Sequence, residues 1–144
     1  ELLLAAVDAA LQRPVDALLL IGRRDVRSGN SWMHNLPILA KGPERCTLLI
    51  HPSDAAARSL ADGSLARLQN AFGELTVPVR VSDEVMPGVV SLPHGWGHNL
   101  DGAQLTLAAE RPGANMNVLL DDATRDPLSG NAVLSGVPVA LSAI

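Results

Sequence analysis

Residues 22–35 hold a dense group of side chains that could bind a ligand, and they directly follow an apolar run at 17–21. The segment contains three arginines, two serines, two asparagines, a tryptophan and a histidine. Arg, Ser and Asn side chains donate hydrogen bonds, and a tryptophan supplies a flat wall. The pattern predicts a buried strand that ends in a binding loop for a large, polar, anionic ligand. A solvated loop with a few surface arginines is the alternative interpretation.

A second loop of similar chemistry, Pro-His-Gly-Trp-Gly-His-Asn at residues 93–99, follows another apolar run. His94 and His98 are four residues apart, which on a helix would suit a metal ion. The proline and the two glycines of this loop make a helix unfavourable, and no glutamate follows His94 as the helical zinc-protease motif requires. We therefore expect no metal site here. The glycines indicate a backbone that approaches a ligand closely with its N–H groups directed outward.

The composition excludes several classes of function. The chain has 144 residues and a formal net charge of −4, with 47% hydrophobic and 2% aromatic residues. An acidic chain without a Lys/Arg block does not suit general nucleic-acid binding or a polybasic membrane contact. No apolar run approaches the roughly 20 residues of a membrane span. Neither a serine-hydrolase frame around Ser31 nor a glycine-rich phosphate loop is present. One domain with an aliphatic core is expected.

The single cysteine and the N-terminal residues limit the possibilities further. Because Cys46 is the single cysteine, an internal disulfide and a Cys-rich metal site are excluded. Cys46 precedes an apolar run, so we expect a buried cysteine at the start of a strand. The first residues lack a starting Met and a basic leader, and thus do not resemble a signal peptide. They resemble an internal segment of a longer chain. A cytoplasmic location is the default expectation.

Hydrophobic periodicity predicts a mainly β domain with one or two short helices. The expected helices are 2–12, ended by Arg13-Pro14, and 55–60, capped by Ser53 or Asp54. The expected strands are residues 15–21, 47–50, 64–68, 74–81, 89–92 and 138–141. Both polar loops follow strands, which suggests a barrel with the two loops at one end.

Four stretches together resemble the C-terminal molybdopterin dinucleotide-binding domain of bacterial molybdopterin oxidoreductases, the superfamily of formate dehydrogenases, periplasmic-type nitrate reductases and dimethyl sulfoxide reductases. The resemblance covers roughly residues 15–141, and its specificity lies in the order and spacing of the stretches. They are 23–35 with its Asn-Ser-Trp-Met-His-Asn core, His-Pro-Ser-Asp-Ala at 51–55, the run 72–98, and Asn117 followed by Asp-Pro-Leu-Ser-Gly at 126–130.

The resemblance implies a six-stranded double-psi β-barrel over residues 14–144, after a connecting helix at 1–13 from a preceding domain. In such enzymes this domain covers two molybdopterin guanine dinucleotides that chelate one molybdenum or tungsten. The protein ligand of the metal and the 4Fe-4S cysteines lie elsewhere in the enzyme. The resemblance favours a formate-dehydrogenase-like parent enzyme. Because the metal ligand and the cluster lie elsewhere, we expect no catalytic residue, metal ligand or turnover in this chain alone. Its partners would be the preceding domains and the bis-molybdopterin guanine dinucleotide. The cofactor would carry out the reaction, and the domain would bind and orient it.

The resemblance also implies which residues contact the cofactor. They are Arg24, Ser28, Asn30, Ser31, Trp32 and His34 in the first loop, His94, Trp96, Gly97 and His98 in the second, and Asn117 at a pterin edge. Pyrophosphate favours Arg side chains and backbone N–H groups, and the edge of a pterin favours Asn, Ser and main-chain groups.

Two alternatives remain open, and both are free-standing double-psi barrels. One is a small pyruvoyl-type decarboxylase, because such enzymes cleave themselves at a Gly-Ser bond that enters a strand, as Gly63-Ser64 does. Asp62-Gly63 as a simple helix stop explains the same residues. The other is a partner-binding module of the kind found on ATPases, which has no need for two tryptophan–histidine loops at one end.

Overall fold

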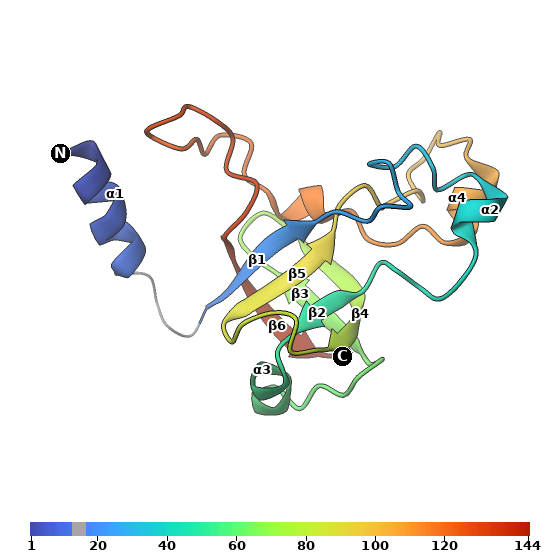
Figure 1. Cartoon of the computed structure of the whole chain (residues 1–144), viewed down its shortest axis with the longest axis horizontal. Coiled ribbons are helices and arrows are strands. Elements are labelled where there is room, and N and C mark those ends of the chain that lie inside the picture. The colour runs from blue at the N-terminus through green and yellow to red at the C-terminus, as the bar shows by residue number, and fades with distance from the viewer. Residues whose placement is uncertain (13–16) are drawn as a thin grey trace.

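A computed structural model describes residues 1–12 and 17–144, and within them six strands form a closed barrel. The strands are β1 Leu18–Arg23, β2 Leu48–Ile50, β3 Leu65–Gln69, β4 Glu74–Val81, β5 Val89–Pro93 and β6 Val137–Ala143. Their order around the barrel is β1-β5-β2-β4-β3-β6 (Figure 1). The pairs β1–β5 and β2–β4 are parallel, and the other four are antiparallel. The predicted double-psi β-barrel is confirmed.

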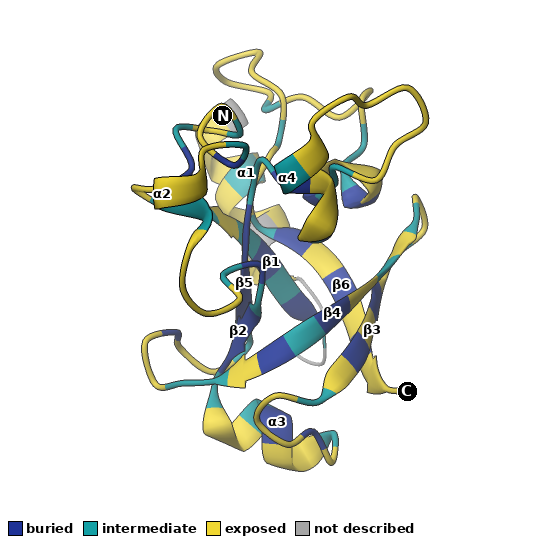
Figure 2. Cartoon of the chain, turned by 90° about the vertical axis from the view of Figure 1, so that its right-hand side faces the viewer, coloured by how far each residue is buried: buried dark blue, intermediate teal, exposed yellow. Residues whose placement is uncertain are grey.

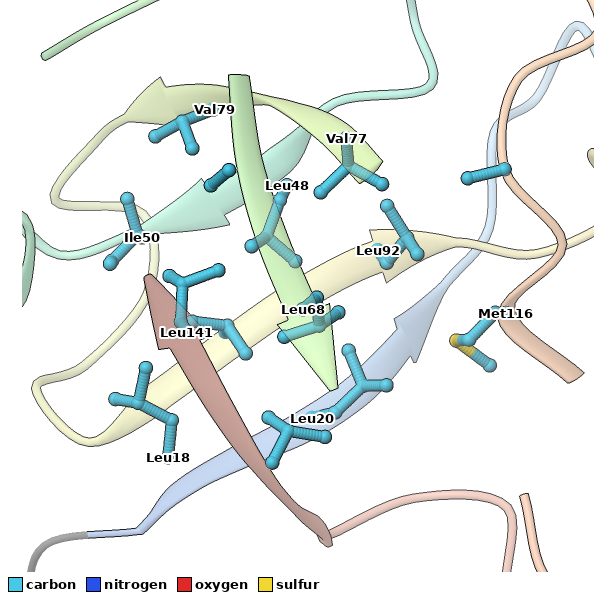
Figure 3. Close-up of a cluster of buried hydrophobic side chains, with 14 of the residues drawn as sticks. Leu18, Leu20, Leu48, Ile50, Leu68, Val77, Val79, Leu92, Met116 and Leu141 are labelled. Atoms are coloured by element: carbon cyan, nitrogen blue, oxygen red, sulfur yellow. The ribbon is translucent and has the colours of Figure 1, made fainter. Parts of the chain in front are cut away.

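The alternation of apolar residues explains the strands that face solvent on one side. In β4 the side chains of Val77 and Val79 are buried, while Thr76 and Arg80 on either side of them are exposed. The strands β2 and β5 are buried almost throughout, as expected for continuous apolar runs. Leucine and valine side chains from all parts of the barrel fill its interior (Figure 3), so the core is aliphatic as predicted.

The helices are short. They are α1 Leu2–Leu11, α2 Pro37–Ala40, α3 Pro52–Ala57, α4 Thr106–Glu110 and the 3-10 helix η1 Met116–Leu119. The prediction of α1 is confirmed, whereas its expected end at Arg13-Pro14 and the boundary between 13 and 14 lie outside the described residues. The first strand begins at Leu18, and residues 15 and 16 of the expected strand also lie outside that part of the chain. No helix of the described residues is long and apolar enough to cross a membrane.

The predicted start of α3 was wrong. The helix begins at Pro52, and its N-cap is His51, whose Nδ1 accepts a hydrogen bond from the backbone N–H of Ser53 at 3.2 Å. Proline suits the first helical position because that position needs no N–H donor, so the cap falls on the residue before it. Asp54 instead accepts a hydrogen bond from the backbone N–H of Gly88 at 2.7 Å, which joins α3 to the turn before β5.

The Gly63-Ser64 pair forms a turn between α3 and β3. Gly63 has a φ of +78° and donates its backbone N–H to the carbonyl oxygen of Val79 at 2.8 Å. The hydroxyl of Ser64 donates to the carbonyl oxygen of Ala61 at 2.7 Å. These contacts account for both residues as a helix stop that leads into a strand.

The parallel pairing of β1 and β5 brings the two polar loops to one end of the barrel. Arg23, the last residue of β1, lies opposite Pro93, the last residue of β5. Both segments therefore leave the barrel on the same side, which confirms the prediction. Figure 2 shows α2 and α4 at this end and α3 at the other.

Candidate functional site

The two loops pack directly on one another. Gly95 has a φ of +86°, and a Cβ atom built on it would lie only 1.8 Å from the carbonyl oxygen of Asn30. The backbone N–H of His94 also donates to the carbonyl oxygen of Arg23 at 3.3 Å. A single surface at the end of the barrel thus carries side chains from both loops.

Arg23 is a structural residue, although the sequence groups it with the other two arginines of the predicted binding loop. Its guanidinium donates to the carbonyl oxygens of Ser91 and Thr47, the latter at 2.6 Å. It therefore ties β1 to β5 and to the segment before β2. Burial lowers the pKa of Arg23, and the carbonyl oxygens supply the partners that a half-buried guanidinium needs.

Several predicted contact residues remain available on the surface of the barrel end. Arg24 is exposed and donates a hydrogen bond to the side chain of Asn30, which is also exposed and has a φ of +66°. His94 is half-buried, and burial lowers its pKa, to which the nearby charge of Arg24 adds. Ser31 is half-buried, whereas Trp32 is 84% exposed.

The second tryptophan has a different place. Trp96 is only 8% exposed and stacks on His34, with ring centroids 4.0 Å apart, and His34 is itself 3% exposed. Nδ1 of His34 shares a hydrogen bond with Nε2 of His98 at 2.6 Å. We call these three residues the aromatic cluster. Trp96, a predicted cofactor contact, has its ring packed within the chain against His34 and beside Gly113.

Four buried side-chain polar atoms lack a hydrogen-bond partner among the described residues, and three of them are Oγ of Ser28, Nε2 of His34 and Nε1 of Trp96. Such atoms are uncommon in folded proteins, and an unpaired buried group costs about 1–3 kcal/mol. All three belong to the predicted cofactor contacts. Nε of Arg45 also makes no hydrogen bond, but it lies 3.7 Å from the carboxylate of Asp25 and is thus ion-paired.

The glycines of the second loop serve the packing of the loop. The backbone N–H of Gly97 donates to the carbonyl oxygen of Pro112 at 2.7 Å, and a Cβ atom on Gly97 would lie 2.5 Å from Cβ of Asn115. The N–H of Gly97 is therefore occupied within the chain, contrary to the expectation that it points outward to a ligand. This packing places the start of η1, and with it the exposed Asn117, beside the second loop.

Cys46 is buried as predicted and precedes β2. Its sulfur accepts a hydrogen bond from the backbone N–H of Ala114 at 3.2 Å, and burial raises its pKa to about 11. The thiol is therefore protonated and unreactive at neutral pH. Within residues 1–12 and 17–144 no group of three or more His, Cys, Asp or Glu side chains could hold a metal ion.

The sequence did not indicate the cavity of about 280 Å³ beside the aromatic cluster. It lies between α2 and α4, and His34 and Trp96 form part of its wall (Figure 1 shows the two helices). Asn35 fixes this arrangement, because its side-chain oxygen accepts a hydrogen bond from the backbone N–H of Ala108 at 3.0 Å. Residues 37–45 and 107–111, which line the rest of the cavity, are too far apart in the sequence for any local pattern to join them.

The histidines of the site make stability depend on pH. Burial is the main cause that lowers the pKa of three histidines, His34, His94 and His98. The neighbouring His98 and Arg45 lower the pKa of His34 further. The unfolded chain, with a histidine pKa of about 6.5, then binds more protons than the folded chain as the pH falls below that value. The resulting stability is fully present above pH ~6.5 and is lost as the pH falls toward the lowered pKa values.

We therefore expect the urea midpoint of unfolding to decrease as the pH is lowered from ~7.5 to ~5.5. This pH range lies above the one in which carboxylates titrate. The His34→Gln variant should show a weaker dependence on pH, whatever its stability at the upper end of this window. A midpoint that stays constant or rises on acidification would contradict the burial of these imidazoles.

Comparison with known proteins identifies the domain. The family model described as "Molydopterin dinucleotide binding domain" matches residues 18–138. The dimethyl sulfoxide/trimethylamine N-oxide reductase of Cereibacter sphaeroides is 45% identical over 64 residues, which are 44% of this chain and 8% of that protein. The molybdopterin-containing subunit of the arsenate respiratory reductase of Chrysiogenes arsenatis is 30% identical over 119 residues, 78% of this chain and 14% of that protein.

One subunit of the tetrathionate reductase of Salmonella typhimurium is 30% identical over 112 residues, 66% of this chain and 11% of that protein. The chain thus spans between 8% and 14% of the length of these three relatives. Among solved structures, acetylene hydratase from Pelobacter acetylenicus has the same fold, with a TM-score of 0.72 and 23% identity over 98% of this chain and 20% of that one. Because the family model matches well over half of the chain, this protein belongs to the molybdopterin dinucleotide-binding domain family of the molybdopterin oxidoreductases.

Proposed function

We propose that this chain binds and orients a bis-molybdopterin guanine dinucleotide as the C-terminal domain of a molybdenum or tungsten oxidoreductase. The observation that carries the proposal is the meeting of the two polar loops at one end of the barrel, where Gly95 packs on Asn30. The family match supports the cofactor class, and the assignment of individual contacts rests on the geometry of the loops.

The residues at this end fit a cofactor with phosphates and a polar ring system. Arg24 offers an exposed guanidinium and Asn30 an exposed amide, and both groups suit phosphate oxygens. The unpartnered hydroxyl of Ser28 can donate to or accept from a ring edge. His94 beside Arg24 and Asn117 in η1 complete the polar surface.

When bound, such a cofactor supplies two-electron redox chemistry at its metal. The residues of this chain bind and orient it: Arg24 and Asn30 hold negative charge, Ser28 and Ser31 contact polar edges, and the exposed ring of Trp32 excludes water from the covered side. The aromatic cluster acts as a rigid support beneath these groups, because His34 and Trp96 are buried and stacked.

The reaction of the parent enzyme is a further proposal. The relatives are named as reductases of sulfoxide, N-oxide, tetrathionate and arsenate, and these names favour a parent that reduces an oxygenated substrate. A formate-dehydrogenase-like parent stays a prediction from the sequence. Assays of the full-length enzyme with dimethyl sulfoxide and with formate, using a viologen dye as electron carrier, distinguish the two.

We also propose that residues 1–13 connect the barrel, residues 14–144, to a preceding domain that carries the metal ligand and a 4Fe-4S cluster. Leu3, Leu4 and Leu11 of α1 are exposed, and such apolar side chains favour a covered surface in the full enzyme. A cytoplasmic location remains a proposal, which fractionation of cells that make the full-length enzyme tests.

The Arg24→Gln variant tests the cofactor site. Loss of a charged hydrogen bond of about 1.5–3 kcal/mol weakens binding by roughly ten-fold or more. We expect the full-length enzyme with this change to retain much less molybdenum and guanine nucleotide after gel filtration, as measured by metal analysis and by release of GMP. Arg67→Gln is the matched control, since Arg67 is an exposed arginine in β3.

Equal retention in the Arg24 and Arg67 variants would overturn the role of Arg24. The mass of the purified 144-residue chain tests the decarboxylase alternative, because self-cleavage between Gly63 and Ser64 would give two fragments.

A further inference from the structure

The cavity between α2 and α4, here called the α2/α4 cavity, is lined in part by buried side chains whose ring nitrogens have no partner. Its volume is about 280 Å³, and much of its lining is apolar. The apolar residues are Pro37, Ala40, Pro43, Leu107 and Ala108. Two of the lining side chains, His34 and Trp96, are more than nine-tenths buried, and each has a ring nitrogen with no hydrogen-bond partner among the described residues.

Both nitrogens can donate. The indole Nε1–H of Trp96 has no acceptor function, so only an acceptor can satisfy it. Nδ1 of His34 is paired with Nε2 of His98. When His98 donates in this pair, the neutral His34 ring must carry its own proton on Nε2, which then becomes a second donor.

The cavity lining offers an anion the positive charge of Lys41. The lining holds three cations, Lys41, Arg45 and Arg111, and two carboxylates, Glu44 and Glu110, and Arg45 is also ion-paired with Asp25 at 3.7 Å. In the part of the chain that the structure describes, the ammonium group of Lys41 makes no hydrogen bond or ion pair, so its charge is not committed elsewhere. The carboxylate of Glu44 accepts a hydrogen bond from the backbone N–H of Cys46 at 2.8 Å.

The two arginines fix the shape of the rim. Arg111 donates to the carbonyl oxygens of Ala40 at 3.2 Å and Gly42 at 2.8 Å, and Arg45 donates to that of Leu39 at 2.9 Å. Their guanidinium groups thus hold the segment after α2 in place.

We propose that the α2/α4 cavity is a binding site for a small oxyanion, a carboxylate or a phosphate-type group, which accepts hydrogen bonds from Trp96 and His34 and pairs with Lys41. Free anions and the phosphates of the dinucleotide share this chemistry. The site does not depend on the reaction of the parent enzyme. Only the dinucleotide, as the source of the anion, rests on the proposed function.

The histidine pair gives the proposed site a pH dependence of definite sign. When the pair takes up one proton, both outer ring nitrogens carry hydrogen and the shared hydrogen bond persists, so Nε2 of His34 is a donor and the cluster gains a positive charge. Besides His98, the groups that face His34 are Arg45, which opposes protonation, and Asp25, which favours it. Affinity for an anion of constant charge, such as sulfate, therefore rises as the pH falls from about 7.5 toward about 5.5.

The experiment is a titration of the ¹⁵N-labelled 144-residue chain with sodium phosphate, sulfate and acetate at constant ionic strength. The chain has two indole N–H groups, those of Trp32 and Trp96, which the Trp32→Phe variant assigns. We expect a saturable shift of the Trp96 signal and no saturable shift of the Trp32 signal. Lys41→Gln, an exposed change that should leave the fold intact, is expected to weaken the affinity several-fold, and Arg67→Gln should leave it unchanged.

Three results would overturn the proposal: no saturable shift of the Trp96 signal with any of the three anions, equal affinity in the Lys41→Gln variant, or an affinity for sulfate that falls on acidification. A parallel titration with GDP separates the sources. GDP binding at least ten-fold tighter than phosphate indicates the dinucleotide, and equal affinities indicate a free anion. A failed titration together with the expected loss of cofactor in the Arg24→Gln enzyme would overturn this site and leave the proposed function intact.

Discussion

The Gly95→Ala variant is expected to lose about 3 kcal/mol of unfolding free energy, the sum of left-handed backbone strain and overpacking. Gly95 has a φ of +86°, and the new methyl group would lie 1.8 Å from the carbonyl oxygen of Asn30. That oxygen belongs to the backbone, so no side chain can rotate away to make room. The two loops must separate, and the surface that carries Arg24 and Asn30 must change with them. Urea unfolding followed by circular dichroism measures the loss.

Gly102→Ala is the matched control. Gly102 has almost the same φ, +84°, but apart from its chain neighbours no described heavy atom lies within 4 Å of the place that its new methyl group would take. Its substitution should cost only the backbone strain, about 1–2 kcal/mol. If both variants lose the same free energy, the contact between the loops does not exist as described. If Gly95→Ala is more harmful, the full-length enzyme with this change should also retain less cofactor than the Gly102 variant.

The strands were predictable because a strand with one buried face alternates apolar and polar residues. The run 74–81 shows this alternation, and β4 has those same bounds. The short apolar run 47–50 predicted β2 within one residue. The position of the loops followed from the polarity that begins where each run ends. By contrast, α2 and α4 have four and five residues, too few for a helical period to show.

The site was predictable in its residue types and less so in its geometry. His34, Trp96 and His98 meet as expected of two loops at one end, but the sequence could not indicate that their rings would pack on one another. Arg23 and Arg24 are neighbours with opposite roles, because side chains of adjacent residues point to opposite faces as a strand ends. The α2/α4 cavity depends on contacts between residues that are far apart in the sequence, such as Asn35 with Ala108.

The two tryptophans should respond to substitution in opposite ways. Trp96→Ala removes a ring that is 8% exposed, stacks on His34 and lies against Gly113, so we expect a loss of about 3–5 kcal/mol, typical of a large buried aromatic residue. Trp32→Ala removes a ring that is 84% exposed and should change stability by less than about 0.5 kcal/mol. Urea unfolding of the 144-residue chain measures both, and the remaining tryptophan reports its own exposure by its emission wavelength.

Cofactor retention should show the reverse order once stability is taken into account. The Trp32→Ala enzyme should fold normally and yet retain less cofactor, because the exposed ring is the one proposed to lie against the ligand. Trp96→Phe keeps an aromatic ring in the cluster and removes the unpartnered indole N–H, so it should fold, retain cofactor and lose affinity for oxyanions. A small loss of stability in Trp96→Ala would contradict the buried cluster, and full retention of cofactor in Trp32→Ala would remove Trp32 from the proposed site.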